Sequence, residues 1–170
     1  SLYVTLGDFE KSAAILEEVV KLKAATMGMK SDAVAVTLIS LATTYECSEE
    51  FDKAMKSLKK AYKIYTEIEG YSSEKSTSTL NLIAQLYEAM NDHNRASIAY
   101  LGVLRGCKIN LGKDHLRVGE MYFKLGHSLR LTGQLEKALK CMKESLPIYV
   151  GKGVEMSDVE MIASVMHEMA

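Results

Sequence analysis

Four related seven-residue segments occur in this sequence, and each begins 42 residues after the one before it. The copies are GDFEKSA from Gly7, EEFDKAM from Glu49, NDHNRAS from Asn91 and GQLEKAL from Gly133. A fixed period of about 20 to 50 residues is typical of a solenoid, in which each unit buries its apolar face against its neighbours. The register predicts one repeat array with units at 1–28 (partial), 29–70, 71–112 and 113–154, followed by a lone terminal helix at 155–170.

Each period contains two stretches in which apolar residues follow helical spacing. Within 29–70 the first stretch carries Val34, Leu38, Leu41, Ala42 and Tyr45, and the second carries Phe51, Ala54, Leu58, Ala61 and Tyr62. We therefore predict an all-α fold of antiparallel helix pairs, stacked into a right-handed superhelix.

Residues suited to helix crossings and helix ends keep the same register. Small side chains, which permit a close helix crossing, recur at Ser12, Ala54, Ala96 and Ala138. The residues expected to end the second helix of a pair are Gly28, Gly70 and Gly112. The residues expected to cap the next first helix are Ser31, Ser73 and Ser157. The single proline, Pro147, is expected to kink or finish the last second helix.

The charges are nearly balanced, because 21 basic and 22 acidic side chains give a net charge of -1. Such a balance lacks the broad positive field of proteins that bind nucleic acid or anionic membranes. No apolar run approaches the roughly 18 residues that a membrane span requires, and we expect no secretory signal. Cys47, Cys107 and Cys141 lack CxxC spacing, which favours buried thiols over a disulfide or zinc framework. We therefore expect a cytoplasmic protein without nucleic-acid or membrane partners.

The repeated Leu, Gly, Tyr and small Ala positions resemble the tetratricopeptide repeat, whose usual unit has about 34 residues. The longer form with the pattern LGxDHPxVAxxLxxLAxxYxxxGxYxxA resembles the repeats of kinesin light chains and related cytoplasmic adaptors. The matching segment here is LGKDHLRVGEMYFKLGHSLRLTGQLEKA, from Leu111 to Ala138. Leu116 stands where the family prefers Pro, and Gly119 and Gly126 stand where it prefers Ala.

This resemblance implies that a partner binds in a concave groove lined by outward-facing residues of the first helices. The predicted partner-binding residues are Ile39, Thr43, Asn81, Gln85, Phe123, Lys124, His127 and Arg130. The amides of Asn81 and Gln85 can bond a peptide N–H and C=O. Ile39 and Phe123 would supply apolar pockets.

The three basic residues of that set, Lys124, His127 and Arg130, gather positive charge suited to an acidic side chain or a carboxylate. We therefore expect a protein or peptide partner with acidic character. The alternative is that all these positions are solvated helix faces whose polarity serves no partner.

The C-terminal segment carries apolar residues that a further helix would normally cover, so we expect a fragment of a longer array. Met161, Ile162, Val165 and Met166 would form this packing edge or, in isolation, a dimer contact. The alternative is a deformable binding stripe of methionines, formed by Met156, Met161, Met166 and Met169.

Catalytic patterns are absent from the sequence: there is no GxSxG, Walker loop or dinucleotide fingerprint. His167 and Glu168 begin an HExxH pattern that the sequence does not complete, and His93 is expected to pack in a turn, as Phe9 and Phe51 do. We predict a non-enzymatic scaffold, without cofactor or metal, that binds a protein or peptide in its groove. The alternatives are a self-association module that dimerises through the terminal helix and a nucleic-acid-binding repeat, which would need a basic groove.

Overall fold

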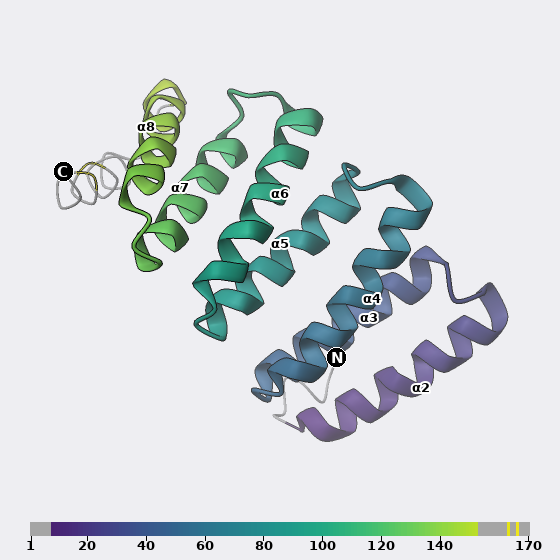
Figure 1. Ribbon diagram of the computed structural model, residues 1–170. Coiled ribbons are helices and arrows are strands. Elements are labelled where there is room, and N and C mark those ends of the chain that lie inside the picture. The colour runs from purple at the N-terminus through teal and green to yellow at the C-terminus, as the bar shows by residue number, and fades with distance from the viewer. Residues whose placement is uncertain (1–7, 153–162, 164–165, 167–170) are drawn as a thin grey trace. The chain divides into compact units, whose positions relative to one another are not determined.

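The computed structural model describes residues 8–152 together with Ala163 and Met166. Between residues 9 and 151 it contains seven α-helices and no strand (Figure 1). The helices are α2 (Phe9–Met27), α3 (Asp32–Cys47), α4 (Phe51–Glu69), α5 (Glu74–Ala89), α6 (His93–Leu111), α7 (Leu116–Leu131) and α8 (Leu135–Gly151). The first helices of the pairs are α3, α5 and α7, and the second helices are α2, α4, α6 and α8; both sets begin at intervals of 42 residues. The predicted all-α repeat is confirmed.

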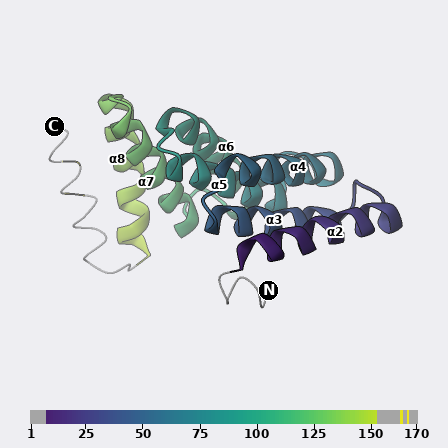
Figure 2. The ribbon, with the colours of Figure 1, turned by 90° about the horizontal axis from the view of Figure 1, so that it is seen from below.

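The helices form two compact units that divide within α5. The first unit ends at Leu86 and contains α2, α3, α4 and most of α5, whereas the second begins at Tyr87 and contains α6, α7 and α8. In the first unit α3 packs against α2 and α4, and in the second α7 packs against α6 and α8. Within each unit, helices joined by one turn run antiparallel (Figures 1 and 2). The right-handed superhelix stays a prediction.

The predicted close crossings are confirmed, because the small residue of each repeat is completely or almost completely buried. Its exposed fraction is 1% for Ser12 and 0% for Ala54, Ala96 and Ala138. A larger side chain at these positions would displace a neighbouring helix.

The core of the first unit lies between α3 and α4, where Val34 and Leu38 pack with Ile64 and Tyr65. Lys75 of α5 joins three helices of this unit. Its Nζ lies 2.5 Å from Asp32 Oδ1 of α3 and 2.9 Å from Glu69 Oε1 of α4. The hydrogen bonds to these two carboxylates raise the pKa of Lys75.

The turn from a first to a second helix has the same hydrogen bonds in every repeat. After α3, the Glu50 N–H donates to the Tyr45 carbonyl at 2.8 Å and the Glu49 N–H donates to the Glu46 carbonyl at 3.0 Å. This pair of bonds is the Schellman motif, which needs one residue in the left-handed conformation. The equivalent turns after α5 and α7 repeat both bonds. The turn residues are Glu49, Asn91 and Gly133, with φ of 60°, 57° and 75°.

The predicted helix ends are only partly correct. Gly28, Gly70 and Gly112 end their second helices with φ of 84°, 88° and 84°, as expected. Ser73 caps α5, because its Oγ accepts the Ser76 N–H at 3.1 Å. Ser31 does not cap α3, since its hydroxyl donates to the Gly28 carbonyl at 3.0 Å instead.

Two further predictions concern the C-terminal end. Ser157 lies outside the described residues. Pro147 does not finish α8, which continues to Gly151. Proline removes one intrahelical hydrogen bond. The last turn of α8 is nevertheless hydrogen-bonded, because the Lys152 N–H donates to the carbonyls of Ile148 and Tyr149, both at 3.2 Å.

Candidate partner-binding surface

In the first unit, the predicted residues on α3 differ in exposure. Thr43 is exposed, and its hydroxyl donates to the Ile39 carbonyl at 3.2 Å. Ile39 is half-buried and packs against the cluster that contains Val34 and Leu38. Part of its side chain therefore belongs to the core, and the remainder is available to a partner.

The predicted amides of this unit, Asn81 and Gln85, lie one turn apart on α5 and are both half-buried. Asn81 Oδ1 is buried and accepts no hydrogen bond from the described residues. Leaving such an atom without a partner costs about 1 to 3 kcal/mol. A donor that reached Asn81 Oδ1 would therefore relieve an unfavourable state.

In the second unit, Phe123 of α7 packs against Met142 and Tyr149 of α8 and is half-buried. It contributes to the core between these helices as well as to the surface. Lys124, the next residue, holds its Nζ 5.8 Å from the centre of the Tyr100 ring, so its charge is partly directed back onto the protein.

A polar cluster surrounds the other two predicted basic residues, His127 and Arg130. Glu88 accepts hydrogen bonds from the Tyr100 hydroxyl at 2.6 Å and from the Ser128 hydroxyl at 3.2 Å. Burial, and then the bond to Glu88, raises the pKa of Tyr100. The cluster thus contains a carboxylate that partly offsets the positive charge predicted from the sequence.

His127 contributes less positive charge than its residue type suggests. Burial lowers its pKa, and the nearby Arg130 charge lowers it further. Arg130 Nε is buried and has no hydrogen-bond partner among the described residues. The Nε–H of Arg130 is therefore a buried donor that no described residue uses.

Two further predictions fall in this unit. His93, the first residue of α6, is half-buried with its Nδ1 enclosed, as expected for a packed turn residue. Of the predicted self-association residues, Met161, Ile162 and Val165 lie outside the described residues, and Met166 packs half-buried against Met142 and Tyr149. Self-association stays a prediction.

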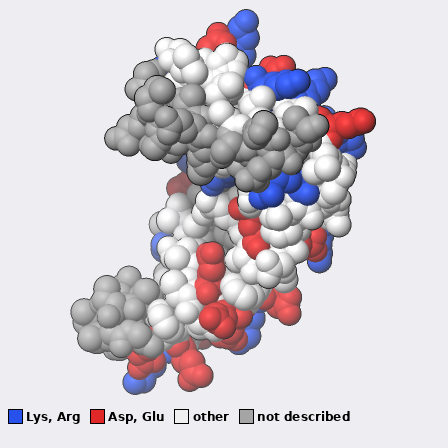
Figure 3. Space-filling model, turned by 90° about the vertical axis from the view of Figure 1, so that its left-hand side faces the viewer, with Lys and Arg blue, Asp and Glu red and all other residues white. Residues whose placement is uncertain are grey.

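Acidic and basic side chains are interspersed on the face shown in Figure 3, in keeping with a net charge of -1. Among the described residues no group of three or more His, Cys, Asp or Glu side chains could hold a metal ion. No helix within the described part of the chain is both long and apolar enough to cross a bilayer.

The family is decided by a sequence profile. The profile described as "Tetratricopeptide repeat" matches residues 1–67 and 75–149. This chain belongs to the tetratricopeptide repeat family. No protein of curated function matches its sequence.

Solved structures share the tetratricopeptide repeat fold of this chain. BtubC (BKLC) from P. vanneervenii is similar over 89% of this chain and 61% of its own, with 23% identity and a TM-score of 0.78. The TPR-like repeats assigned to a kinesin light chain of Podosopora anserina cover 98% of this chain and 84% of their own, with 16% identity and a TM-score of 0.77. MamA covers 98% and 90%, with 18% identity and a TM-score of 0.62. The expected likeness to kinesin light chain-type repeats is therefore confirmed for the fold.

Three cavities of this tetratricopeptide repeat chain lie away from the predicted surface, since none is lined by a predicted partner-binding residue. Two of them lie in the first unit, beside lysines of α4 that the sequence analysis did not single out. The sequence nevertheless indicates this surface, because lysines at 53, 56, 60 and 63 follow helical spacing and share one face of that helix.

Proposed function

We propose that this chain is a non-enzymatic adaptor that holds a peptide segment of a partner protein against its first helices. Membership of the tetratricopeptide repeat family supports protein binding in general. The observation that carries the choice of surface is that Asn81 and Arg130 each keep a buried hydrogen-bonding atom without a partner among the described residues. Both residues were predicted to bind from their place in the repeat.

Each unit carries its own part of this surface, and the two parts differ in chemistry. On α5 of the first unit, Asn81 and Gln85 present amides that can bond a peptide backbone whatever its sequence. In the same unit, Ile39 and Thr43 on α3 offer a mixed apolar and polar contact.

On α7 of the second unit, Arg130 and Lys124 supply charge for a carboxylate of the partner, and Phe123 offers the exposed part of its ring. Glu88 moderates this preference, because it places a negative charge in the cluster of His127 and Ser128. We therefore propose a partner with one or two acidic residues and not a polyacidic tract.

The same proposal includes a reducing, cytoplasmic location. All three cysteines are free thiols: Cys107 is buried and Cys141 is half-buried, but Cys47 is exposed, so the expectation of a buried thiol is wrong for Cys47. Burial raises the pKa of the Cys107 and Cys141 thiols, which keeps them protonated and unreactive.

The experiment begins with peptides selected from a displayed random library against the wild-type chain. The best peptide is then titrated by fluorescence anisotropy against the wild type, Asn81→Ala and Arg130→Ala. Such peptides usually bind with a micromolar Kd, which corresponds to a binding free energy of about 8 kcal/mol. Loss of a charge-assisted bond in Arg130→Ala should weaken binding by about 1.5 to 3 kcal/mol, with a smaller loss for Asn81→Ala.

Matched controls are available on α6, a second helix. Arg105→Ala and Asn94→Ala remove the same side-chain types from exposed positions and should leave the affinity unchanged. Added salt should weaken binding of an acidic peptide to the wild type. Equal affinities for the wild type and both groove variants, with unchanged circular dichroism, would place the binding surface elsewhere.

A further inference from the structure

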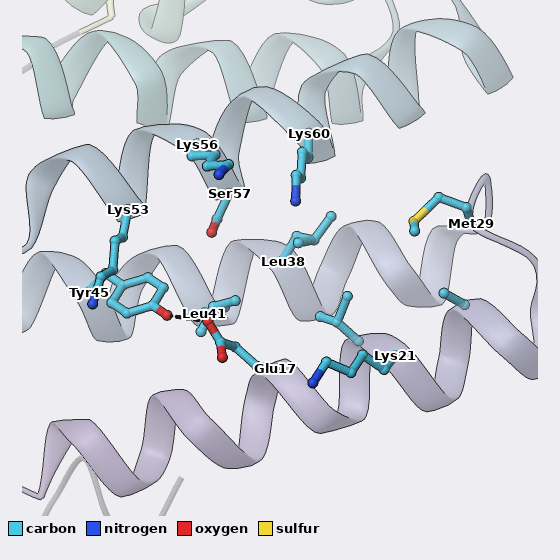
Figure 4. A pocket seen from close by; sticks show the side chains of 12 residues that line it. Glu17, Lys21, Met29, Leu38, Leu41, Tyr45, Lys53, Lys56, Ser57 and Lys60 are labelled. Carbon is cyan, nitrogen blue, oxygen red and sulfur yellow. Dashed lines mark hydrogen bonds between the residues drawn. The ribbon is translucent and has the colours of Figure 1, made fainter.

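The first unit contains an open trough between α2 and α4, with α3 as its floor (Figure 4). Val20 and Ala24 of α2 and Leu38 and Leu41 of α3 form its apolar surface. One cavity of this trough has a volume of about 500 Å³. A second cavity of about 330 Å³ shares Val20, Met29, Leu38 and Lys60 with the first, so the two form one continuous surface.

A row of lysines follows one side of this trough. Lys53, Lys56, Lys60 and Lys63 all project from α4, and together they span about 15 Å along the helix axis. In Figure 4 the labelled members of the row lie above Leu38 and Leu41, with Glu17 and Lys21 of α2 on the opposite side. In all, six lysines and two glutamates line the two cavities, although the whole chain has a net charge of -1.

The two central lysines of this row have no acidic partner among residues 8–152. Lys53 is paired with Glu50, and Lys63 lies 4.0 Å from Glu67. Lys56 and Lys60 are exposed and form no ion pair with the described residues. The trough therefore combines an apolar floor with uncompensated positive charge along its edge.

One end of the trough is closed by a hydrogen bond between helices. The Tyr45 hydroxyl of α3 donates to Glu17 Oε1 of α2 at 2.6 Å, and Lys53 Nζ lies 5.2 Å from the centre of the Tyr45 ring. This arrangement holds α2 and α3 at a fixed separation, so the trough is formed before any ligand arrives.

We propose that this α2–α4 trough docks an acidic amphipathic helix of a partner protein. Apolar side chains of that helix would cover Val20, Ala24 and Met29, and its carboxylates would face Lys56 and Lys60. The spacing of the lysines favours a helix, because acidic residues three and four apart on a parallel or antiparallel helix repeat at the same intervals.

An anionic lipid fits these observations less well than a helix does. A single headgroup needs its basic residues gathered at one point, whereas this row distributes charge along about 15 Å. The docking surface is also separate from the proposed peptide surface on the first helices, since it shares none of the residues assigned there.

The test uses a fluorescent synthetic peptide of about 14 residues, long enough to form several helical turns, with Leu at intervals of three and four and Glu on the flanking positions. Anisotropy should show saturable binding to the wild type. Lys56→Glu combined with Lys60→Glu should weaken this binding by about tenfold, because two ion pairs are replaced by repulsion. Lys59→Glu combined with Lys140→Glu makes the same change in net charge outside the trough and should weaken it less than twofold.

Two further arms separate the sources of binding. Met29→Gln, at an exposed position of the trough, should weaken binding through loss of apolar contact. A peptide with a central Pro should bind poorly, because it cannot remain helical.

Equal effects of the two charge-reversed variants would overturn the proposal, and so would binding of oleate or anionic vesicles without binding of the peptide. Asn81→Ala should leave the peptide's affinity unchanged, so failure of this proposal and failure of the first-helix surface give different results.

Discussion

The turn after each first helix places one residue in the left-handed conformation, and the three repeats use different residues there. Gly133 adopts φ of 75° without steric penalty, and Asn91 tolerates 57° better than most residues. Glu49 adopts φ of 60°. The hydrogen bonds of this turn come from the backbone, so the turn does not need the Glu49 side chain. The first of these turns is therefore the strained one.

We expect Glu49→Gly to stabilise the chain. A left-handed residue with a Cβ costs about 1 to 2 kcal/mol, and glycine returns about 0.5 to 1 kcal/mol of this as extra entropy in the unfolded state. The net increase in the free energy of unfolding should be about 0.5 to 1 kcal/mol in urea denaturation. Asn91→Gly, at the equivalent position, should change it by much less, and a loss of stability in Glu49→Gly would show that the Glu49 side chain matters to the turn.

His127 makes stability depend on pH. Because burial and Arg130 lower its pKa in the folded state, the unfolded chain binds the proton more readily. Protonation therefore favours unfolding as the pH falls below the ordinary value of 6.5. Between about pH 7.5 and pH 5.5 the urea midpoint of the wild type should fall more than that of His127→Gln. Parallel curves for the two proteins would contradict this explanation.

At the scale of elements, two glycines allow α7 to lie close to α8. A Cβ at Gly126 would lie 3.1 Å from Met142 Cγ and 3.2 Å from the Ala138 carbonyl oxygen. A Cβ at Gly119 would lie 3.1 Å from Ile148 Cγ2 and 3.2 Å from Tyr149 Cε2. The two positions differ in how easily the neighbouring atom can move. The Ala138 carbonyl near Gly126 belongs to the α8 backbone, whereas the Ile148 atoms near Gly119 belong to a half-buried side chain.

The same substitution is therefore expected to change stability by different amounts at these two positions. Alanine in a helix gains about 1 kcal/mol over glycine, whereas overpacking costs about 1 to 3 kcal/mol. We expect Gly126→Ala to lower the free energy of unfolding by about 1 kcal/mol, because the backbone of α8 must shift. Gly119→Ala should be close to neutral. Urea denaturation measures both, and a stabilising Gly126→Ala would mean that the helices separate without cost.

At the scale of the whole molecule, the 42-residue register, the helical spacing of apolar residues and the repeated Leu, Gly, Tyr and Ala positions together were sufficient to predict the all-α fold, the family and the buried small positions. These features depend on spacing along the chain, which the sequence displays directly. Ala54, Ala96 and Ala138 are buried because they occupy one place in a recurring helix pair, and that place could be found by aligning the chain with itself.

The candidate sites were harder to predict because they depend on interactions between helices. The sequence placed His127 and Arg130 among basic residues, but it did not show that burial lowers the pKa of His127 or that Glu88 lies in the same cluster. Likewise, the helical spacing of Lys53, Lys56 and Lys60 was visible, but the apolar trough beneath them exists only once α2 and α3 are packed together. Ser31 shows the same limit at a helix end, because the sequence did not show that its hydroxyl would bond to the Gly28 carbonyl and leave α3 without a side-chain cap.

The most direct test of the proposed adaptor function is a ¹H–¹⁵N NMR titration of the labelled chain with the library-selected peptide. The side-chain signals of interest are the Asn81 amide and the Arg130 Nε–H, because Asn81 Oδ1 and Arg130 Nε have no hydrogen-bond partner among the described residues. We predict that both signals shift on binding, together with backbone amides of α3, α5 and α7. Shifts confined to α2, α4, α6 and α8, with both side-chain signals unchanged, would contradict binding through the first helices.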